Sequence, residues 1–317
     1  MDAMRLRTGR ADGARPDHPA TATMGDWLRH RLPPRADAAG LLARGDVVDR
    51  DGRPVRAADP YRPDTDVWIR RPLPADEPEV PGTLDVVFSD DRIVVVDKPP
   101  FLATMPRGAH VRQTVVTRLR DELDLPDLVP AHRLDRLTSG LLLLVIDPQW
   151  RGAYQTLFER RAVRKVYRAI APLFPGAPGS LPIVVRNRIV KDRGVHQARV
   201  VPGEPNARTL VELEQILARP APDPAGPTPE PAPPARALYR LTPTSGRTHQ
   251  LRVHMSGLGV PIENDPLYPA ERDVAPDDFA RPLQLLAAEL AFTDPVDATS
   301  RTFRSRRRLP LADPSLD

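Results

Sequence analysis

The stretch Ala131–Ile146 reads AHRLDRLTSGLLLLVI and joins a charged, turn-forming segment to an apolar run. The run Leu141–Ile146 is too short to cross a membrane and is bounded by a glycine and by an Asp-Pro pair, so it indicates a fully buried strand. Asp135 stands just before that strand, between Arg133 and Arg136. Flanking arginines keep a carboxylate ionised and orient it. The junction therefore predicts either a structural ion pair at a strand entrance or an active site.

Length and composition describe an ordinary globular protein. The chain has 317 residues, of which 40% are hydrophobic, enough for one large domain or two smaller ones. It has no cysteine, which excludes disulfides, thiol nucleophiles and sulfur-ligated zinc sites. No apolar run approaches about 18 residues, and the N-terminal segment lacks an apolar signal core. We therefore expect no membrane association and a cytoplasmic location.

The basic residues gather in two clusters, although they exceed the acidic ones only by 46 to 42. One cluster is Phe158–Arg168, with five basic residues and one glutamate, and the other is Arg301–Arg308, with five arginines and no acid. Either cluster alone is usually a solvated face. Two of them together indicate a surface that contacts phosphates, because backbone charge supplies most of the affinity for nucleic acid.

The chain is predicted to contain a tail, a small module, a linker and one large domain. Residues 1–23 are polar and lack an apolar pattern, so we expect a disordered tail. Residues 24–71 predict two short helices followed by two strands around an Asp-Gly turn. Residues 72–82 form a proline-rich linker. The large domain is 83–317, in which residues 219–236 hold eight prolines and predict an insertion loop.

Within the large domain, local patterns predict both strands and helices. Helical periods within 115–123 and 150–158 predict two helices. A third helix is expected after Thr244 and Ser245, either of which would be its N-cap, with Gly257 and Gly259 at its end. Apolar or alternating runs predict strands at 84–88, 93–97, 141–146, 163–171, 197–201, 209–216 and 237–241.

Three segments of the chain resemble the motifs of one enzyme family. His132–Gly140, HRLDRLTSG, resembles the HRLDRxTSG signature of pseudouridine synthases of the RluA type. Downstream, Lys165–Ala169, KVYRA, resembles the family's K-x-Y-x-A motif, and Gly246–His254, GRTHQLRVH, resembles its third motif. A Lys-Pro pair at Lys98 stands where the family has one, and the resemblance extends from about residue 86 to residue 309.

The resemblance implies an α+β fold. Its catalytic domain would have a mixed, mainly antiparallel sheet of the pseudouridine synthase type. Residues 24–71 resemble, in degenerate form, the αL RNA-binding module often fused ahead of these synthases, and a structural lid is the alternative because few basic residues share a face. One departure is Leu285-Leu286-Ala287, where the family has Leu-His-Ala. It removes a histidine expected to be structural, so the chemistry would remain intact.

The resemblance also implies an activity, the isomerisation of uridine to pseudouridine in ribosomal or transfer RNA. Uracil is detached from C1′, rotated and rejoined through C5, so no atoms are gained or lost and no cofactor is required. The resemblance assigns Asp135 as the catalytic carboxylate and places Tyr167 against the target uracil, with a hydroxyl that could relay a proton. It pairs Arg252 with the carboxylate, for which the planar guanidinium fork is suited. Whether Asp135 attacks the sugar or removes a proton from it stays open.

Further RNA contacts are expected from the motif residues His132, Arg133, Arg136, Lys165, Arg247 and His249. A metal site is not expected, because His249 and His254 are five residues apart and point in different directions on a helix. We expect RNA as the partner and a monomeric protein.

Two other functions remain as alternatives. One is a non-catalytic RNA-binding or ribosome-assembly protein on the same fold, against which the presence of Asp135, Tyr167 and Arg252 argues. The other is an enzyme that acts on free nucleosides, which would explain the carboxylate but not the arginine clusters.

Overall fold

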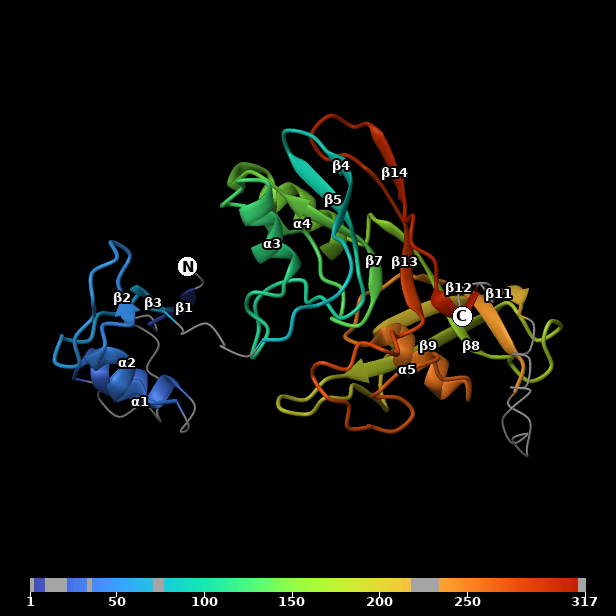
Figure 1. The fold of residues 1–317 in the computed structure, drawn as a ribbon, viewed down its shortest axis with the longest axis horizontal. Coiled ribbons are helices and arrows are strands. Elements are labelled where there is room, and N and C mark those ends of the chain that lie inside the picture. The colour runs from blue at the N-terminus through green and yellow to red at the C-terminus, as the bar shows by residue number, and fades with distance from the viewer. Residues whose placement is uncertain (1–2, 9–21, 33–35, 71–76, 218–233, 313–317) are drawn as a thin grey trace. The chain divides into compact units, whose positions relative to one another are not determined.

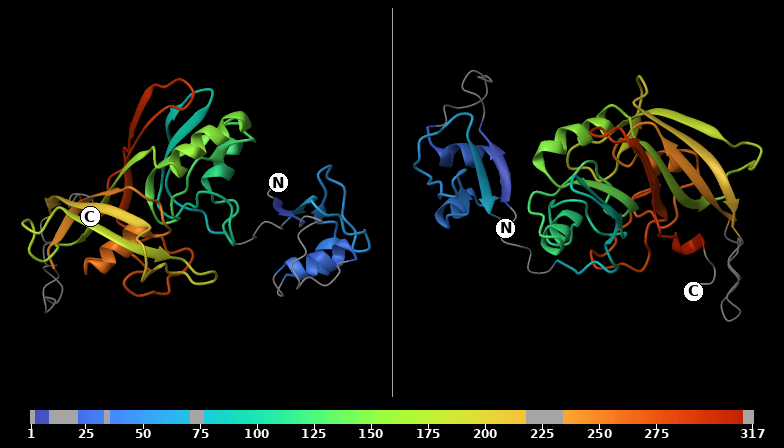
Figure 2. Two further views of the ribbon diagram at one scale, coloured as in Figure 1. Left: turned by 180° about the vertical axis from the view of Figure 1, so that it is seen from behind. Right: turned by 90° about the horizontal axis from the view of Figure 1, so that it is seen from above.

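The computed structural model describes residues 3–8, 22–32, 36–70, 77–217 and 234–312. The chain divides into two compact units, Met1–Ala75 and Asp76–Asp317 (Figures 1 and 2). In the described ranges, no helix has the length and apolar character needed to cross a membrane.

The N-terminal unit contains the two helices expected from its sequence, α1 (Met24–Arg31) and α2 (Ala38–Ala43). Each begins at a side-chain cap: Thr23 accepts from the amide of Asp26, and Asp37 from the amide of Gly40. Such caps satisfy amides that have no partner inside a helix. The helices and strands of this unit share a small core that includes Met24, Trp27, Leu28, Leu42, Val47, Val67 and Ile69.

The prediction of a disordered tail is wrong for residues 3–7. Ala3–Arg7 forms strand β1, which pairs antiparallel with β3 (Asp66–Arg70), and β3 also pairs with β2 (Val47–Val48). Leu6 is buried in the core of the unit. Strand pairing and the burial of Leu6 together offset the conformational entropy that this polar segment loses when it becomes ordered. Residues 1–2 and 9–21 of the predicted tail lie outside the described ranges. RNA binding by residues 24–71 stays a prediction.

The C-terminal unit is built on an 11-stranded sheet. Its strands are β4 (Asp85–Ser89), β5 (Ile93–Lys98), β6 (Val129–Pro130), β7 (Ser139–Val145), β8 (Arg164–Pro172), β9 (Ile183–Val190), β10 (Arg199–Val201), β11 (Ala207–Ile216), β12 (Arg236–Pro243), β13 (Leu285–Thr293) and β14 (Ser300–Arg304). The order is β10-β9-β11-β12-β8-β13-β7-β5-β4, with β14 beside β13 and β6 beside β7. The β13–β7 pair is parallel and the other pairs are antiparallel. The mixed, mainly antiparallel sheet is therefore confirmed.

Strand β7 is buried throughout, and its run Leu141–Val145 is apolar because both of its faces are covered. The even-numbered leucines of β7 lie in one cluster with Val115 and Leu119 of helix α3 (Val115–Glu122). The odd-numbered leucines lie in another cluster with Tyr154 of helix α4 (Arg151–Glu159). Both helices lie beside β5 and β7 in Figure 1. A strand buried on both faces has a continuous apolar run rather than an alternating one.

Helix α5 (Gln250–Gly257) begins later than predicted. Its N-cap is His249, in the left-handed region with φ 56°, and neither Thr244 nor Ser245 caps it. Ser245 instead donates from its hydroxyl to the side-chain oxygen of Gln250, 2.9 Å away. The preceding residues are thus held as a loop, while Gly259, with φ 78°, ends the helix as expected. Strands β6, β9, β13 and β14 were not predicted. Short helices occur at Pro148–Trp150 and Pro310–Ala312.

The predicted linker, residues 72–82, is wrong for its second half. Glu77 accepts hydrogen bonds from the amides of Val111, Arg112 and Gln113, and Val80 is buried in the core of the C-terminal unit. Residues 71–76 lie outside the described ranges. So does most of the predicted insertion 219–236, whose last residue, Arg236, instead begins β12.

Candidate active site

Asp135 lies in the turn between β6 and β7, which is held through its backbone. The amide of Thr138 donates to the Asp135 carbonyl at 3.1 Å. Thr104 donates from its hydroxyl to the carbonyl of Leu134 at 2.9 Å. The side chain of Asp135 remains 33% exposed, so an accessible carboxylate stands on a fixed turn.

Lys98 lies fully buried beneath the same turn. Its Nζ donates to the carbonyls of Pro99 (2.9 Å), Leu102 (2.8 Å) and Arg136 (3.0 Å). Burial holds the pKa of Lys98 well below its ordinary value, and the negative charge of Asp135 opposes that shift. The Lys-Pro pair of the sequence thus connects the end of β5 to the turn that carries Asp135.

Arg252, on α5, has two carboxylate neighbours. Its Nε and Nη2 donate to Asp265 Oδ2 and Oδ1 at 2.7 and 2.5 Å. Its Nη1 lies 3.9 Å from Asp135 Oδ2. The expected bidentate pairing with Asp135 is therefore wrong, because Asp265 occupies the guanidinium fork and Asp135 makes only a charge contact. Although burial lowers the pKa of Arg252, the hydrogen bonds and charge of Asp265 raise it above its ordinary value.

Asp265 is itself oriented by backbone groups. Its Oδ1 accepts from the amides of Leu267 at 2.8 Å and Tyr268 at 3.2 Å, and its side chain is fully buried. A buried carboxylate held in this way fixes the guanidinium plane of Arg252. The remaining nitrogen of that guanidinium then faces Asp135.

His249 brings a second nitrogen to the catalytic candidate. Its Nε2 lies 3.9 Å from Asp135 Oδ2, and its Nδ1 lies 3.0 Å from the hydroxyl of Tyr268. The imidazole is only 12% exposed. Burial lowers the pKa of His249, which Asp135 opposes and Arg252 reinforces.

Tyr167 lies in β8 on the same face as Lys165, as the alternation of the strand predicts. Its ring packs against two apolar clusters, and Leu137, two residues after Asp135, touches the same two clusters. Burial and the charge of Asp135 both raise the pKa of Tyr167, so its phenol is neutral at physiological pH. The structure therefore brings Asp135, Tyr167 and Arg252 together.

His132 is engaged in contacts within the protein. Its Nε2 accepts from the amide of Leu143 at 3.2 Å, and its ring stacks on Phe158 with centroids 4.3 Å apart. Burial lowers its pKa to about 3. These contacts connect the motif to β7 and α4, and an RNA contact by His132 stays a prediction.

The other expected RNA-contact residues differ in exposure. Arg133 and Arg247 are exposed. Arg136 is half-buried, and its guanidinium has no hydrogen-bond or ion-pair partner within the part of the chain that the structure describes. Lys165 donates from Nζ to the carbonyl of Ser245 at 3.4 Å. The structure thus leaves the cationic groups of Arg133, Arg136 and Arg247 without acidic partners in the described ranges.

The first basic cluster lines an open groove. Residues 161–165 and 242–244 enclose a volume of about 400 Å³, and Arg161, Arg164 and Lys165 supply its positive charge. Arg164 also lies 3.5 Å from Glu289 but remains 58% exposed. The groove adjoins Ser245, in the loop that leads to His249.

The second basic cluster is partly internal. Arg301 is 14% exposed and forms ion pairs with Asp90 at 3.0 Å and Asp294 at 2.8 Å. Arg307 donates to the carbonyl of the buried Asp97 at 3.0 Å. The expectation that Arg301–Arg308 forms a phosphate-contacting surface is therefore wrong for these two residues, which bind carboxylates and a carbonyl of the protein itself.

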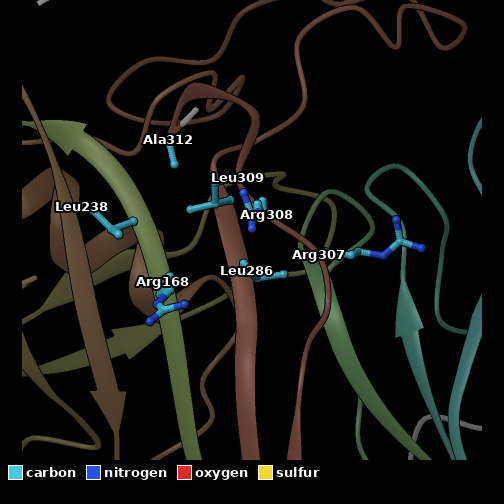
Figure 3. A pocket seen from close by; sticks show the side chains of 7 residues that line it. All are labelled: Arg168, Leu238, Leu286, Arg307, Arg308, Leu309 and Ala312. Atoms are coloured by element: carbon cyan, nitrogen blue, oxygen red, sulfur yellow. The ribbon is translucent and has the colours of Figure 1, made fainter. Parts of the chain in front are cut away.

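A smaller hollow of about 240 Å³ lies on the other face of the sheet. Arg168 follows Tyr167 in β8, so it points to the opposite side and lines this hollow with Leu286 and Leu309 (Figure 3). Leu286 occupies the place of the family's histidine and is buried. That departure therefore lies away from Asp135. The hollow is also lined by Arg307 and Arg308 of the second basic cluster, but by none of the predicted catalytic residues.

Three residues of the site were not assigned a role from the sequence: Lys98, Asp265 and Tyr268. Asp265 and Tyr268 belong to the segment DPLY, which the sequence marks only as similar to the family. The sequence does hold a signal for Asp265. Arg252 is predicted to lie in a helix, and an arginine on the buried face of a helix needs a carboxylate partner. The sequence cannot say which carboxylate it is.

Comparisons with known proteins identify the family of the chain. The profile described as RNA pseudouridylate synthase matches residues 92–257. The chain is 32% identical to the dual-specificity RNA pseudouridine synthase RluA of Vibrio parahaemolyticus, over 74% of this chain and 82% of that protein. It is 27% identical to the tRNA pseudouridine(31) synthase of Saccharomyces cerevisiae, over 66% of this chain and 52% of that protein. The solved structure of human RNA pseudouridylate synthase domain containing 1 shares the fold, with a TM-score of 0.56 and 24% identity over 75% of this chain and 89% of that one.

Proposed function

Because the chain belongs to the RluA-type RNA pseudouridylate synthase family and is an isomerase that converts uridine to pseudouridine in RNA, we propose that Asp135 is its catalytic carboxylate. The observation that carries the proposal is the position of this side chain. It is partly exposed on a turn fixed from below by Lys98, and it lies 3.9 Å from both Arg252 and His249.

The reaction requires few chemical groups. The bond from N1 to C1′ breaks, a bond from C5 to C1′ forms, C5 loses a proton and N1 gains one. A carboxylate beside the ribose can either attack C1′ or remove a proton from the sugar. Both roles use the negative charge of Asp135, which faces the guanidinium of Arg252.

Tyr167 is proposed to stack on the target uracil. Its ring lies beside the turn of Asp135, and stacking on an aromatic ring is a common way to hold an unstacked base of single-stranded RNA. The raised pKa of its phenol favours a role as a neutral contact over a role as a base.

The substrate is proposed to be structured RNA of the ribosomal or transfer class. The groove of Arg161, Arg164 and Lys165 would hold backbone phosphates near the site. The relatives support this class, since one is named for dual specificity on RNA and another for tRNA.

The experiment compares Asp135→Asn with the parent protein. The substrates are ribosomal and transfer RNA transcripts that carry tritium at C5 of uridine, and release of the label reports the reaction. We expect Asp135→Asn to bind RNA normally and to lose label release at least about 1000-fold, because the amide lacks the reacting charge.

The matched control is Asp121→Asn, an exposed carboxylate at the end of α3, which should release label at the parent rate. Comparable release by Asp135→Asn would remove Asp135 from the chemistry. Absence of release from both RNA classes by the parent protein would refute the proposed substrate.

A further inference from the structure

The reaction needs a group that takes the proton from C5. When C5 has joined C1′, it carries both the sugar and its original hydrogen. Loss of that proton lets the electron pair of the C–H bond form the C5–C6 double bond. The electron pair of the C6–N1 double bond returns to N1, which takes up a proton from water, so atoms and charge balance. The accepting group must have a free lone pair near C1′.

We propose that His249 is the base that removes the C5 proton, with Tyr268 as the residue that positions it. This inference rests on the proposed function, since it assumes that Asp135 acts at the sugar. C5 becomes bonded to C1′, so a group beside Asp135 also lies beside C5. Nε2 of His249 meets this condition at 3.9 Å from Asp135 Oδ2.

Hydrogen bonds determine which nitrogen of His249 is free. The hydroxyl of Tyr268 donates to the carbonyl of Ala198 at 3.0 Å and accepts from the amide of Ala198 at 2.6 Å. Its proton is thus used, and its remaining lone pair accepts from Nδ1 of His249 at 3.0 Å. In the neutral imidazole the proton therefore sits on Nδ1, and Nε2 faces Asp135 with an open lone pair.

Tyr167 is the other group in a position to act as a base. Burial and the charge of Asp135 raise its pKa, so deprotonated Tyr167 is scarce at neutral pH. Lys98 is excluded by its contacts, since its amine donates to three backbone carbonyls below the turn. His249 is thus the better placed and the better matched acceptor.

The charges around His249 suit a base that gains a proton for a short time. Burial is the largest effect and lowers the pKa of His249. The negative charges of Asp135 and Asp265 raise that pKa, and the positive charges of Arg252 and Lys191 lower it. The imidazole is therefore neutral before reaction, at neutral pH. Once protonated, Nε2–H points at the carboxylate of Asp135, which stabilises the imidazolium. Below the pKa of His249 the nitrogen is already protonated, so the rate should fall as the pH is lowered.

The test is His249→Gln, which retains a polar side chain toward Tyr268 but cannot act as a base. Single-turnover rates are measured on RNA with uridine or 5-deuterouridine at the target. We expect the rate to fall about 100-fold, the usual contribution of general base catalysis. The ratio of the protium and deuterium rates should rise because proton loss becomes limiting, and the acid limb of the pH–rate profile, below the ordinary histidine pKa of 6.5, should disappear.

The matched control is His254→Gln, in helix α5, whose N-cap is His249. His254 bonds Thr209 and Asn187 through its two nitrogens, so its variant should keep the parent isotope ratio and acid limb. A second variant, Tyr268→Phe, should lower the rate but keep the acid limb, because the base remains and only its positioning is lost.

An isotope ratio in His249→Gln equal to that of the parent, or a retained acid limb, would overturn the inference. RNA binding by the variant, measured in parallel, shows that it is folded. Failure of the proposed function is distinguishable, because Asp135→Asn would then release label at a rate comparable to that of the parent, whatever His249→Gln does.

Discussion

Arg252 shows how one residue serves both stability and chemistry. Its fork is bound by the buried Asp265, and its third nitrogen faces the partly exposed Asp135. A buried pair adds little net stability compared with apolar residues, but removing one partner leaves an uncompensated charge. The two partners of Arg252 should therefore respond differently to mutation.

Asp265→Asn should lower the free energy of unfolding by about 3 kcal/mol or more, since it leaves the Arg252 cation buried without its carboxylate. Arg252→Lys retains the charge but loses the fork, so turnover should fall well beyond any change in RNA affinity.

Chemical denaturation measures the stability of Asp265→Asn, and single-turnover kinetics measure the turnover of Arg252→Lys. Glu271→Gln, at an exposed carboxylate paired with His196, is the control and should change neither. An unchanged turnover number in Arg252→Lys would remove Arg252 from the site.

At the scale of elements, the site depends on the parallel contact between β7 and β13. Gly140 pairs with Ala287 at this contact and has a φ of 106°. A Cβ at Gly140 would lie 2.3 Å from the carbonyl oxygen of Ala287, far inside a normal contact. The glycine of the signature motif is thus required by the close approach of a strand from the end of the chain.

Gly140→Ala should lower the free energy of unfolding by about 2–4 kcal/mol, from strain and overlap together. Gly152→Ala is the matched control: this glycine lies in α4 with no atom within 4 Å of an added Cβ. That change should raise stability by up to about 1 kcal/mol, because alanine favours a helix. Thermal and chemical denaturation measure whether each variant is less or more stable than the parent. Equal stability of Gly140→Ala and the parent would show that the β7–β13 contact can move to accommodate the added methyl group.

At the scale of the whole molecule, the boundary between the units is set by contacts rather than by proline content. Glu77 binds three amides of the loop 111–113, and Val80 lies in the core. Residues 77–82 therefore belong to the C-terminal unit. The contribution of the N-terminal unit to RNA binding can be tested at this boundary.

A chain that begins at Asp76 should keep its fold and the chemistry at Asp135, and should modify RNA more slowly at low enzyme concentration. The loss should appear in KM, because contacts remote from the reacting base contribute to binding. A chain that begins at Leu84 should in addition melt at a lower temperature, since it lacks Glu77 and Val80. Equal KM and equal salt dependence of RNA binding for the full chain and the chain from Asp76 would support the structural-lid alternative.

The sequence by itself determined the features that depend on neighbouring residues. The apolar run of β7, the turn with Asp135, the β4–β5 hairpin and the family motifs all follow from local pattern, and a strand buried on both faces has few other solutions. The cap of α5 was not predictable, because Ser245 has a partner, Gln250, that only the folded loop brings near.

Only the tertiary structure decided which groups meet at the site. Asp265 takes the fork of Arg252, Tyr268 and Ala198 determine the free nitrogen of His249, and Arg301 turns inward to its aspartates. Each of these pairings depends on burial, and most join residues far apart in the chain. A sequence pattern records that a residue is charged, but which partner compensates that charge depends on the packing of the whole domain.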